Sequence, residues 1–250
     1  MFPFLFSYRF YFVAVLNSPR YPDSVFAIFD TVANGGDAVG TCFSVSPKYL
    51  ISCQHFMKGN HLNYRIALTA ERSQAGGITF PAGIMDVKVY RRNKDMDYAI
   101  LELKAEPYNL VPIPISIDPV VADTDVKVFH FPVAEFNDTS TNVVGPYTQW
   151  IKTSIPTAHH IPCGGPGLYR GSSGAPFVSR SGSVVGIHME AASEAAEVNF
   201  AAEMDVDSKI DVISNTVNSN ANVHGSRNTA LQIGKCDELV TILRKLGIIN

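Results

Sequence analysis

The sequence predicts an all-β protein. Two observations favour this class: 18 glycines and 15 prolines interrupt many short apolar runs, and the chain is 10% aromatic with no long helix-forming stretch before its last part. With 46% hydrophobic and 17% charged residues, the 250-residue chain can bury a large core, which excludes disorder as its main state. The net charge of −3 offers no basic surface, so we expect neither nucleic acid nor an anionic membrane as a partner.

The first half of the chain contains short apolar runs with the length of strands. The turn sequence Ser46-Pro47-Lys48 predicts a hairpin between two of them. Their spacing, with glycine, proline and asparagine between them, suits a closed antiparallel barrel. The expected strands are residues 24–30, 40–45, 49–52, 78–80, 85–91 and 98–103.

A second set of strands follows a proline-rich segment. Residues 111–125 contain too many prolines for a central strand, so we expect a linker there. The sequence therefore predicts two units joined by this linker. The strands expected in the second unit are residues 126–132, 148–155, 177–180, 183–189 and 198–204.

The two ends of the chain differ from the body. Over residues 236–247, three leucines fall on one helical face and Gly247 is placed as a C-terminal cap, which predicts a helix. A shorter helix is expected over residues 207–216. Residues 1–22 begin with an aromatic run that no Lys or Arg precedes and that Arg9 interrupts. We expect a packed extension or extra strand there, with a secretory signal as the alternative; the run is too short to span a membrane as a helix.

The four cysteines lie far apart and form no Cys-x-x-Cys pair. We expect buried free thiols, with one or two disulfides as the alternative. His159, His160 and Cys163 have the character of soft-metal ligands, and Cys53 is two residues from His55, but neither set completes a four-ligand zinc site. We therefore expect no metal. No phosphate-binding loop or dinucleotide motif appears, so no cofactor is expected either.

Two polar residues stand next to apolar strands in the first half. His55 follows the strand in YLISCQHF, where a rigid element would aim an imidazole that can act as a general base near neutral pH. Asp97 directly precedes the strand in KDMDYAILEL, where its carboxylate can accept a hydrogen bond from the imidazole and hold the required tautomer. Asp95 is the competing residue, and adjacency to the strand favours Asp97.

A glycine-bounded serine stands before a strand in the second half. In RGSSGAP, Gly171 and Gly174 flank Ser173, the candidate nucleophile. The N–H groups of Gly171 and Ser173 can together form an oxyanion hole, and a side chain at position 171 would obstruct close backbone approach. The order His55, Asp97, Ser173 places two members in the first half of the chain and one in the second.

These three segments resemble the motifs of the chymotrypsin-like (trypsin-like) serine proteases, which usually read TAAHC, DIALL and GDSGGP. The resemblance covers about residues 24–210. It implies two antiparallel six-stranded β-barrels with the active site between them, a polypeptide substrate, and an acyl-enzyme on Ser173. His55 then resembles the general base, Asp97 its partner, and Gly171 with Ser173 the oxyanion hole. The alternative is a catalytically silent module that keeps the fold as a peptide-binding or scaffold domain.

The resemblance divides the chain into an extension (1–22), a first barrel (23–118), a second barrel (119–209) and a C-terminal helical segment (210–250). Some family features are missing. Ser172 replaces the acid that pairs with a new N-terminus in activated members, so we expect activity without zymogen cleavage. No cysteine stands where the family's disulfide flanks the histidine. These departures resemble the viral, bacterial and intracellular branches and favour an intracellular location.

Two further positions concern the residue before the cleaved bond, P1. Gly167 stands where trypsin-like members place the aspartate that binds Lys or Arg, so that preference lacks its anchor. The Gly-Ile-His triplet ending at His188 is similar to that of glutamyl endopeptidases and picornaviral-type proteases, in which the histidine binds a Glu or Gln side chain. This predicts Glu or Gln at P1. The alternative is a shallow apolar pocket with Leu168 and Tyr169, in which His188 is only packed.

Overall fold

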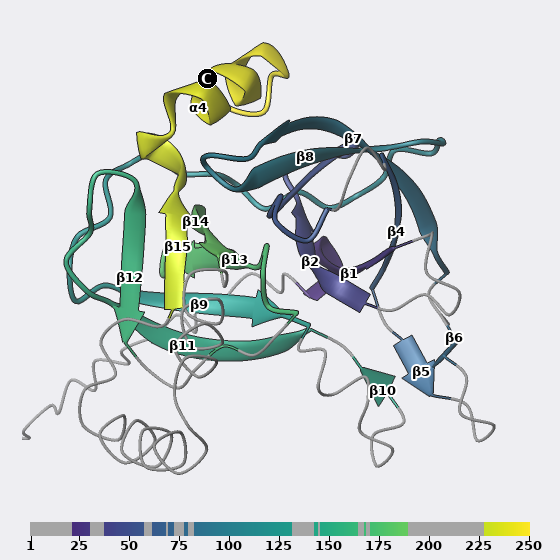
Figure 1. Ribbon diagram of the computed structural model, residues 1–250, viewed down its shortest axis with the longest axis horizontal. Helices are drawn as coiled ribbons and strands as arrows, with labels where there is room; N and C mark the ends of the chain where they lie inside the picture. Colours follow the sequence, from purple (N-terminus) through teal and green to yellow (C-terminus); the bar gives the residue numbers. More distant parts are fainter. Residues whose placement is uncertain are drawn as a thin grey trace, which may run out of the picture.

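The protein is described from a computed structural model, which shows two closed six-stranded antiparallel barrels (Figure 1). This arrangement confirms the expected fold class. The residues that the structure describes are 22–30, 38–57, 62–68, 70–72, 78–79, 83–131, 143–144, 146–164, 168, 171–189 and 228–250. The expected strand at 198–204, the short helix at 207–216 and the extension up to residue 21 lie outside them.

The first barrel closes in the order β1-β2-β3-β8-β7-β4. Its interior is built from strands rich in β-branched and aromatic residues, and every residue of β8 is buried because this strand faces the barrel interior on one side and packed side chains on the other. The hairpin predicted across Ser46-Pro47-Lys48 joins β2 to β3. The strands are β1 (Val25–Asp30), β2 (Ala38–Ser44), β3 (Tyr49–Ser52), β4 (Asn63–Ala67), β7 (Met85–Asn93) and β8 (Tyr98–Leu103).

The second barrel closes in the order β11-β12-β15-β14-β13-β9. Its strands are β9 (Asp125–His130), β11 (Tyr147–Thr153), β12 (His160–Gly164), β13 (Pro176–Ser179), β14 (Val184–Met189) and β15 (Asn228–Gln232). The position of β15 corrects the expected boundary at residue 209. Residues 228–232 were assigned to a C-terminal helical segment, but they pair with both β12 and β14 and so close the barrel.

A small third sheet corrects another expectation. The sequence predicts a barrel strand over residues 78–80, but among the described residues β6 (Ile78–Thr79) pairs with β5 (Ala70–Arg72) and with no barrel strand. β5 in turn pairs with β10 (Val143–Val144), which comes from the second half of the chain.

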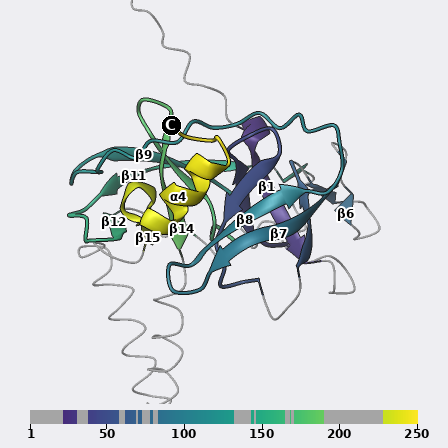
Figure 2. The same ribbon diagram turned by 90° about the horizontal axis from the view of Figure 1, so that it is seen from above.

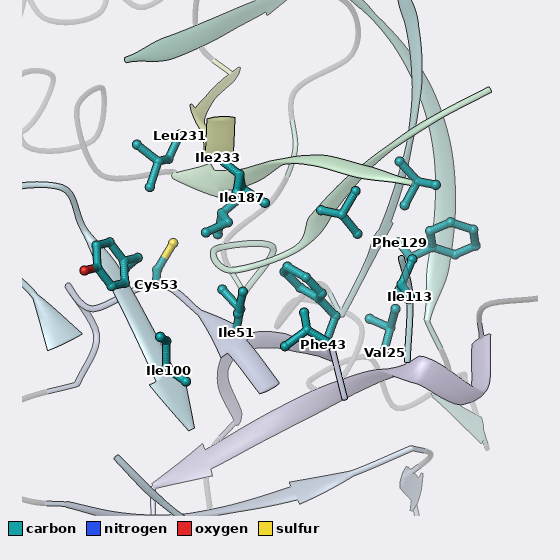
Figure 3. Close-up of a cluster of buried hydrophobic side chains, with 14 of the residues drawn as sticks. Val25, Phe43, Ile51, Cys53, Ile100, Ile113, Phe129, Ile187, Leu231 and Ile233 are labelled. Atoms are coloured by element: carbon teal, nitrogen blue, oxygen red, sulfur yellow. The ribbon is translucent and has the colours of Figure 1, made fainter. Parts of the chain in front are cut away.

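The largest apolar cluster lies between the barrels rather than inside either of them. Figure 3 shows Phe43, Ile51 and Ile100 from the first barrel beside Ile187 and Leu231 from the second. The proline-rich segment contributes Ile113, whose N–H donates to Ser44, and Pro114, whose carbonyl accepts from Val184. Burial of this interface stabilises the barrels against one another, at about 25 cal/mol for each Å² of apolar surface removed from water.

The C-terminal helix α4 (Asp237–Lys245) follows β15 and a short 3₁₀ turn, and it lies over the junction between the two barrels (Figure 2). Its buried Leu239 and Leu243 join the interbarrel cluster, as the apolar face predicted. Glu238 bonds to Arg91 on β7 at 2.9 Å (Nη2 to Oε1). Gly247 ends the helix with a φ of +67°. Among the described residues, no helix has both the length and the apolar character needed to cross a bilayer.

Candidate active site

His55 and Asp97 are hydrogen-bonded at the end of the first barrel. Nδ1 of His55 lies 2.8 Å from Oδ2 of Asp97, and since a carboxylate only accepts, Nδ1 donates; in the neutral ring Nε2 is then the acceptor. Asp97 adopts a left-handed φ of 50°, which aspartate tolerates better than most residues. Its other oxygen, Oδ1, accepts the backbone N–H groups of Gln54 (3.0 Å) and His55 (2.7 Å).

The two aspartates differ in burial and in contact with His55. Asp97 is 8% exposed and meets His55, while Asp95, the competing residue, is exposed in the turn before β8. The imidazole of His55 keeps 30% of its side-chain surface accessible. The structure thus brings together a buried acceptor and a partly accessible ring, with the second ring nitrogen facing away from Asp97.

Ser173 lies in a tight turn between β12 and β13, and it contacts the first barrel through its backbone. Its carbonyl accepts the N–H of Thr41 on β2 at 2.8 Å. Gly174 has a φ of +87°, and a Cβ there would lie well under 3.0 Å from both the Thr41 carbonyl oxygen and Oγ of Ser52. The turn can therefore approach the strands leading to His55 only because position 174 is a glycine.

The carbonyl groups on the N-terminal side of Ser173 are also fixed. Oγ1 of Thr41 donates to the carbonyl of Gly171 at 2.8 Å and accepts the N–H of Phe131 at 3.0 Å. The carbonyl of Ser172 accepts the N–H of Ala175 at 3.0 Å. In a planar trans peptide the C=O and the N–H point in opposite directions. The N–H of Ser173 therefore points opposite to the carbonyl of Ser172. Gly171, with a φ of +94°, is the second backbone donor that the motif predicts.

His188 is fully buried on β14, next to the serine turn. Its Nδ1 lies 3.2 Å from the carbonyl oxygen of Ser172, and its ring stacks on Phe177. Burial lowers the pKa of His188 to about 3, so the ring is neutral at pH 7. Within the part of the chain that the structure describes, Nε2 of His188 has no hydrogen-bond partner.

The other predicted pocket residues are only partly covered. Gly167 and Tyr169 lie outside the described residues. Leu168 is buried, and its N–H donates to Oδ1 of Asn228 at 3.0 Å. Leu168 packs in the second-barrel cluster with Phe177.

One group of donor atoms among the described residues has the composition of a metal site. Sγ of Cys53, a ring nitrogen of His55 and a carboxylate oxygen of Asp97 lie within 4.8 Å of one another. Each has a protein partner, since Sγ of Cys53 donates to the carbonyl of His188 at 2.8 Å and Asp97 is bonded as above. His159 is exposed, and Cys163 is buried away from it with a pKa raised by burial to about 12. All four cysteines are buried free thiols.

Sequence reasoning missed Thr41 and His130. Oγ of Ser172 lies 2.7 Å from Nδ1 of His130, which is 3% exposed at the end of β9. Burial lowers the pKa of His130 to about 4. Both residues stand inside apolar runs, GTCFSV and VKVFHFP, and their polar side chains there were the available signal.

Two six-stranded barrels, with the histidine and aspartate on one and the serine turn on the other, define the chymotrypsin-like fold. The model of the trypsin-like peptidase domain matches residues 40–187, which is more than half of the chain. The chain belongs to the trypsin-like peptidase family and is by family a peptidase. A sequence search among curated proteins gave no significant match.

Solved structures with the same fold include several bacterial proteases. The inactive form of the Rv3671c protease of M. tuberculosis aligns with a TM-score of 0.54 at 16% identity, over 94% of this chain and 96% of that one. The MamO protease domain of Magnetospirillum magneticum aligns with a TM-score of 0.55 at 13% identity, over 89% and 97%. A serine endoprotease of Yersinia pestis aligns with a TM-score of 0.50 at 18% identity, over 68% and 54%.

Proposed function

We propose that the chain is a serine endopeptidase that cleaves peptide bonds through an acyl-enzyme on Ser173. The observation that carries this proposal is the 2.8 Å hydrogen bond from Nδ1 of His55 to buried Asp97, which leaves Nε2 as a base. In the proposed first step, Nε2 takes the proton of the Ser173 hydroxyl as Oγ attacks the substrate carbonyl carbon. The same proton then passes to the leaving amine as the C–N bond breaks.

The backbone of the serine turn supports the second part of the mechanism. Attack moves negative charge onto the former carbonyl oxygen, and donors fixed in advance stabilise that charge most. The N–H of Ser173 is held by the hydrogen bond that the Ser172 carbonyl accepts, and the N–H of Gly171 is its proposed companion. In the second half-reaction, water repeats the attack on the acyl group and releases Ser173.

A catalytically silent module of the same fold is the competing function. Peptide binding alone does not require a histidine that a buried carboxylate orients to accept a proton. The geometry of His55 therefore favours the enzyme. Because the Asp97 carboxylate also caps two backbone N–H groups, that residue alone would be compatible with either function.

Covalent labelling distinguishes the serine endopeptidase from the catalytically silent module. A fluorophosphonate is expected to modify the wild-type protein at Ser173 and to leave Ser173→Ala unmodified, because only an activated hydroxyl displaces fluoride from phosphorus at a useful rate. Mass spectrometry of the tryptic digest identifies the modified residue. Folded wild-type protein that is not labelled would refute the proposed enzyme and favour the silent module.

We propose that the P1 residue is Glu or Gln and that His188 binds its side chain. The hydrogen bonding of His188 favours Gln. Nδ1 of His188 donates to a carbonyl, and the neutral ring therefore offers an acceptor at Nε2. A glutamine amide can donate to that nitrogen, whereas a glutamate carboxylate can bind it only if a proton comes with it. A fully buried ring nitrogen without a partner among the described residues is costly, and a substrate amide would satisfy it.

We expect His188→Ala to reduce the preference for Gln over Leu at P1 by about a hundredfold, measured as the ratio of kcat/KM for two matched peptides. The ratio isolates recognition, because His188 also bonds to Ser172 and its loss lowers turnover of both substrates. A peptide library profiled at pH 7 gives the wild-type preference. Cleavage mainly after Leu, Phe or Tyr with no change in the variant would discard the assignment of His188 and leave that of Ser173 standing.

A further inference from the structure

His130 and Ser172 form a buried polar pair next to the candidate nucleophile. Nδ1 of His130 is 2.7 Å from Oγ of Ser172, and the two residues are 3% and 0% exposed. Ser172 belongs to the turn that carries Ser173, while His130 ends β9, a strand in the wall of the second barrel. The bond therefore joins the turn to a rigid element.

The chemistry of the pair suits a neutral contact. Burial lowers the pKa of His130 to about 4, so the imidazole carries no charge at pH 7 and each ring nitrogen can donate to or accept from a hydroxyl. Breaking the bond would leave two buried polar groups without partners, which is costly. Alternative conformations of the turn that withdraw Oγ of Ser172 are thereby disfavoured.

Three residues from three strands hold the three residues of the turn. Thr41 on β2 binds the carbonyls of Gly171 and Ser173, and His188 on β14 binds the carbonyl of Ser172. His130 on β9 binds the side chain of Ser172. Both the hydroxyl and the carbonyl of Ser172 are thus held by hydrogen bonds. The peptide bond between Ser172 and Ser173 contains the N–H that is the proposed oxyanion donor.

We propose that His130 is a positioning residue that, through Ser172, sets the direction of the Ser173 N–H. It does not touch the substrate. The inference rests on the proposed function, because it concerns the oxyanion site of that same reaction. The contact between His130 and Ser172 stabilises the transition state, in which the oxyanion forms, and does not strengthen binding of the ground-state substrate carbonyl.

The test replaces each partner and both together. We expect Ser172→Ala and His130→Leu each to lower kcat by about tenfold to a hundredfold with little change in KM. The double variant should be no slower than the slower single one, since the two substitutions remove one interaction. His130→Gln, whose amide can bond to the hydroxyl, should recover part of kcat. Binding of a peptide aldehyde, which forms an oxyanion on Ser173, should weaken in parallel with kcat/KM.

Ser44→Ala is the matched control. Ser44 is a buried serine on β2 whose hydroxyl bonds to the carbonyls of Ser24 and Val111, so its loss should lower stability and leave kcat unchanged. Unchanged kcat in folded Ser172→Ala, or independent effects that multiply in the double variant, would overturn the inference. If His130→Leu does not fold, Ser172→Ala still decides. Absence of fluorophosphonate labelling of the folded wild-type protein would instead refute the proposed function.

Discussion

Ser173→Ala and His55→Ala should each lower kcat by a factor on the order of 10⁴–10⁶ and together by no more than either alone, because nucleophile and base act as one unit. Asp97→Asn should cost on the order of 10⁴, since an amide has one oxygen where the carboxylate uses two, one for Nδ1 of His55 and one for two backbone N–H groups. Single-turnover kinetics with a peptide ester measures the acylation step directly.

Asp95→Asn is the control for the aspartate. It lies two residues from Asp97, has the same chemistry and is exposed, so kcat should change less than about twofold, as expected for a surface substitution. Loss of activity in Asp95→Asn together with an active Asp97→Asn would reverse the assignment of these two residues.

Gly174→Ala should destabilise the fold by roughly 2–5 kcal/mol, the sum of overpacking and a left-handed backbone. The added Cβ would meet Thr41 and Ser52, and the carbonyl of Thr41 cannot yield without disturbing β2. Urea denaturation followed by tryptophan fluorescence measures the free energy of unfolding. We expect activity to fall as well, because the serine turn would have to retreat from the first barrel.

Gly83→Ala separates the two causes. Gly83 has a φ of +81°, nearly that of Gly174, but a Cβ there would meet no atom within 4 Å. Its cost should therefore be the backbone part alone, about 1 kcal/mol. Equal destabilisation by both substitutions would mean that close approach at Gly174 contributes nothing.

Much of the fold could be predicted because most strands are short apolar runs between turn residues. β1, β3 and β8 follow this pattern, and α4 follows the helical one. The barrel strands that were not predicted lack it: β4 reads NYRIA, β12 contains a proline, and β15 reads NTALQ, in which three of five residues are polar. They become strands because neighbours in the barrel supply hydrogen-bond partners, and this tertiary effect leaves no local signal.

The residues of the candidate site could likewise be predicted only where the local sequence marks them. His55, Asp97 and the serine turn could be singled out because each follows or precedes a recognisable strand, and the structure places His55 against Asp97. Thr41 and His130 could not, since their roles depend on contacts with the turn that are 130 and 42 positions away along the chain. A polar residue inside an apolar run shows that a partner exists but does not say which.

The interbarrel cluster has a consequence for how the molecule assembles. It includes side chains from β1 near one end of the described chain and from α4 near the other, so its members span more than two hundred positions of the sequence. A cluster that spans so much of the sequence is completed late in folding, because closing long stretches of chain costs entropy before the packing is gained. During translation, Leu239 and Leu243 emerge only after every barrel strand. The packing of the two barrels against one another is therefore complete only after both barrels and α4 have been synthesised.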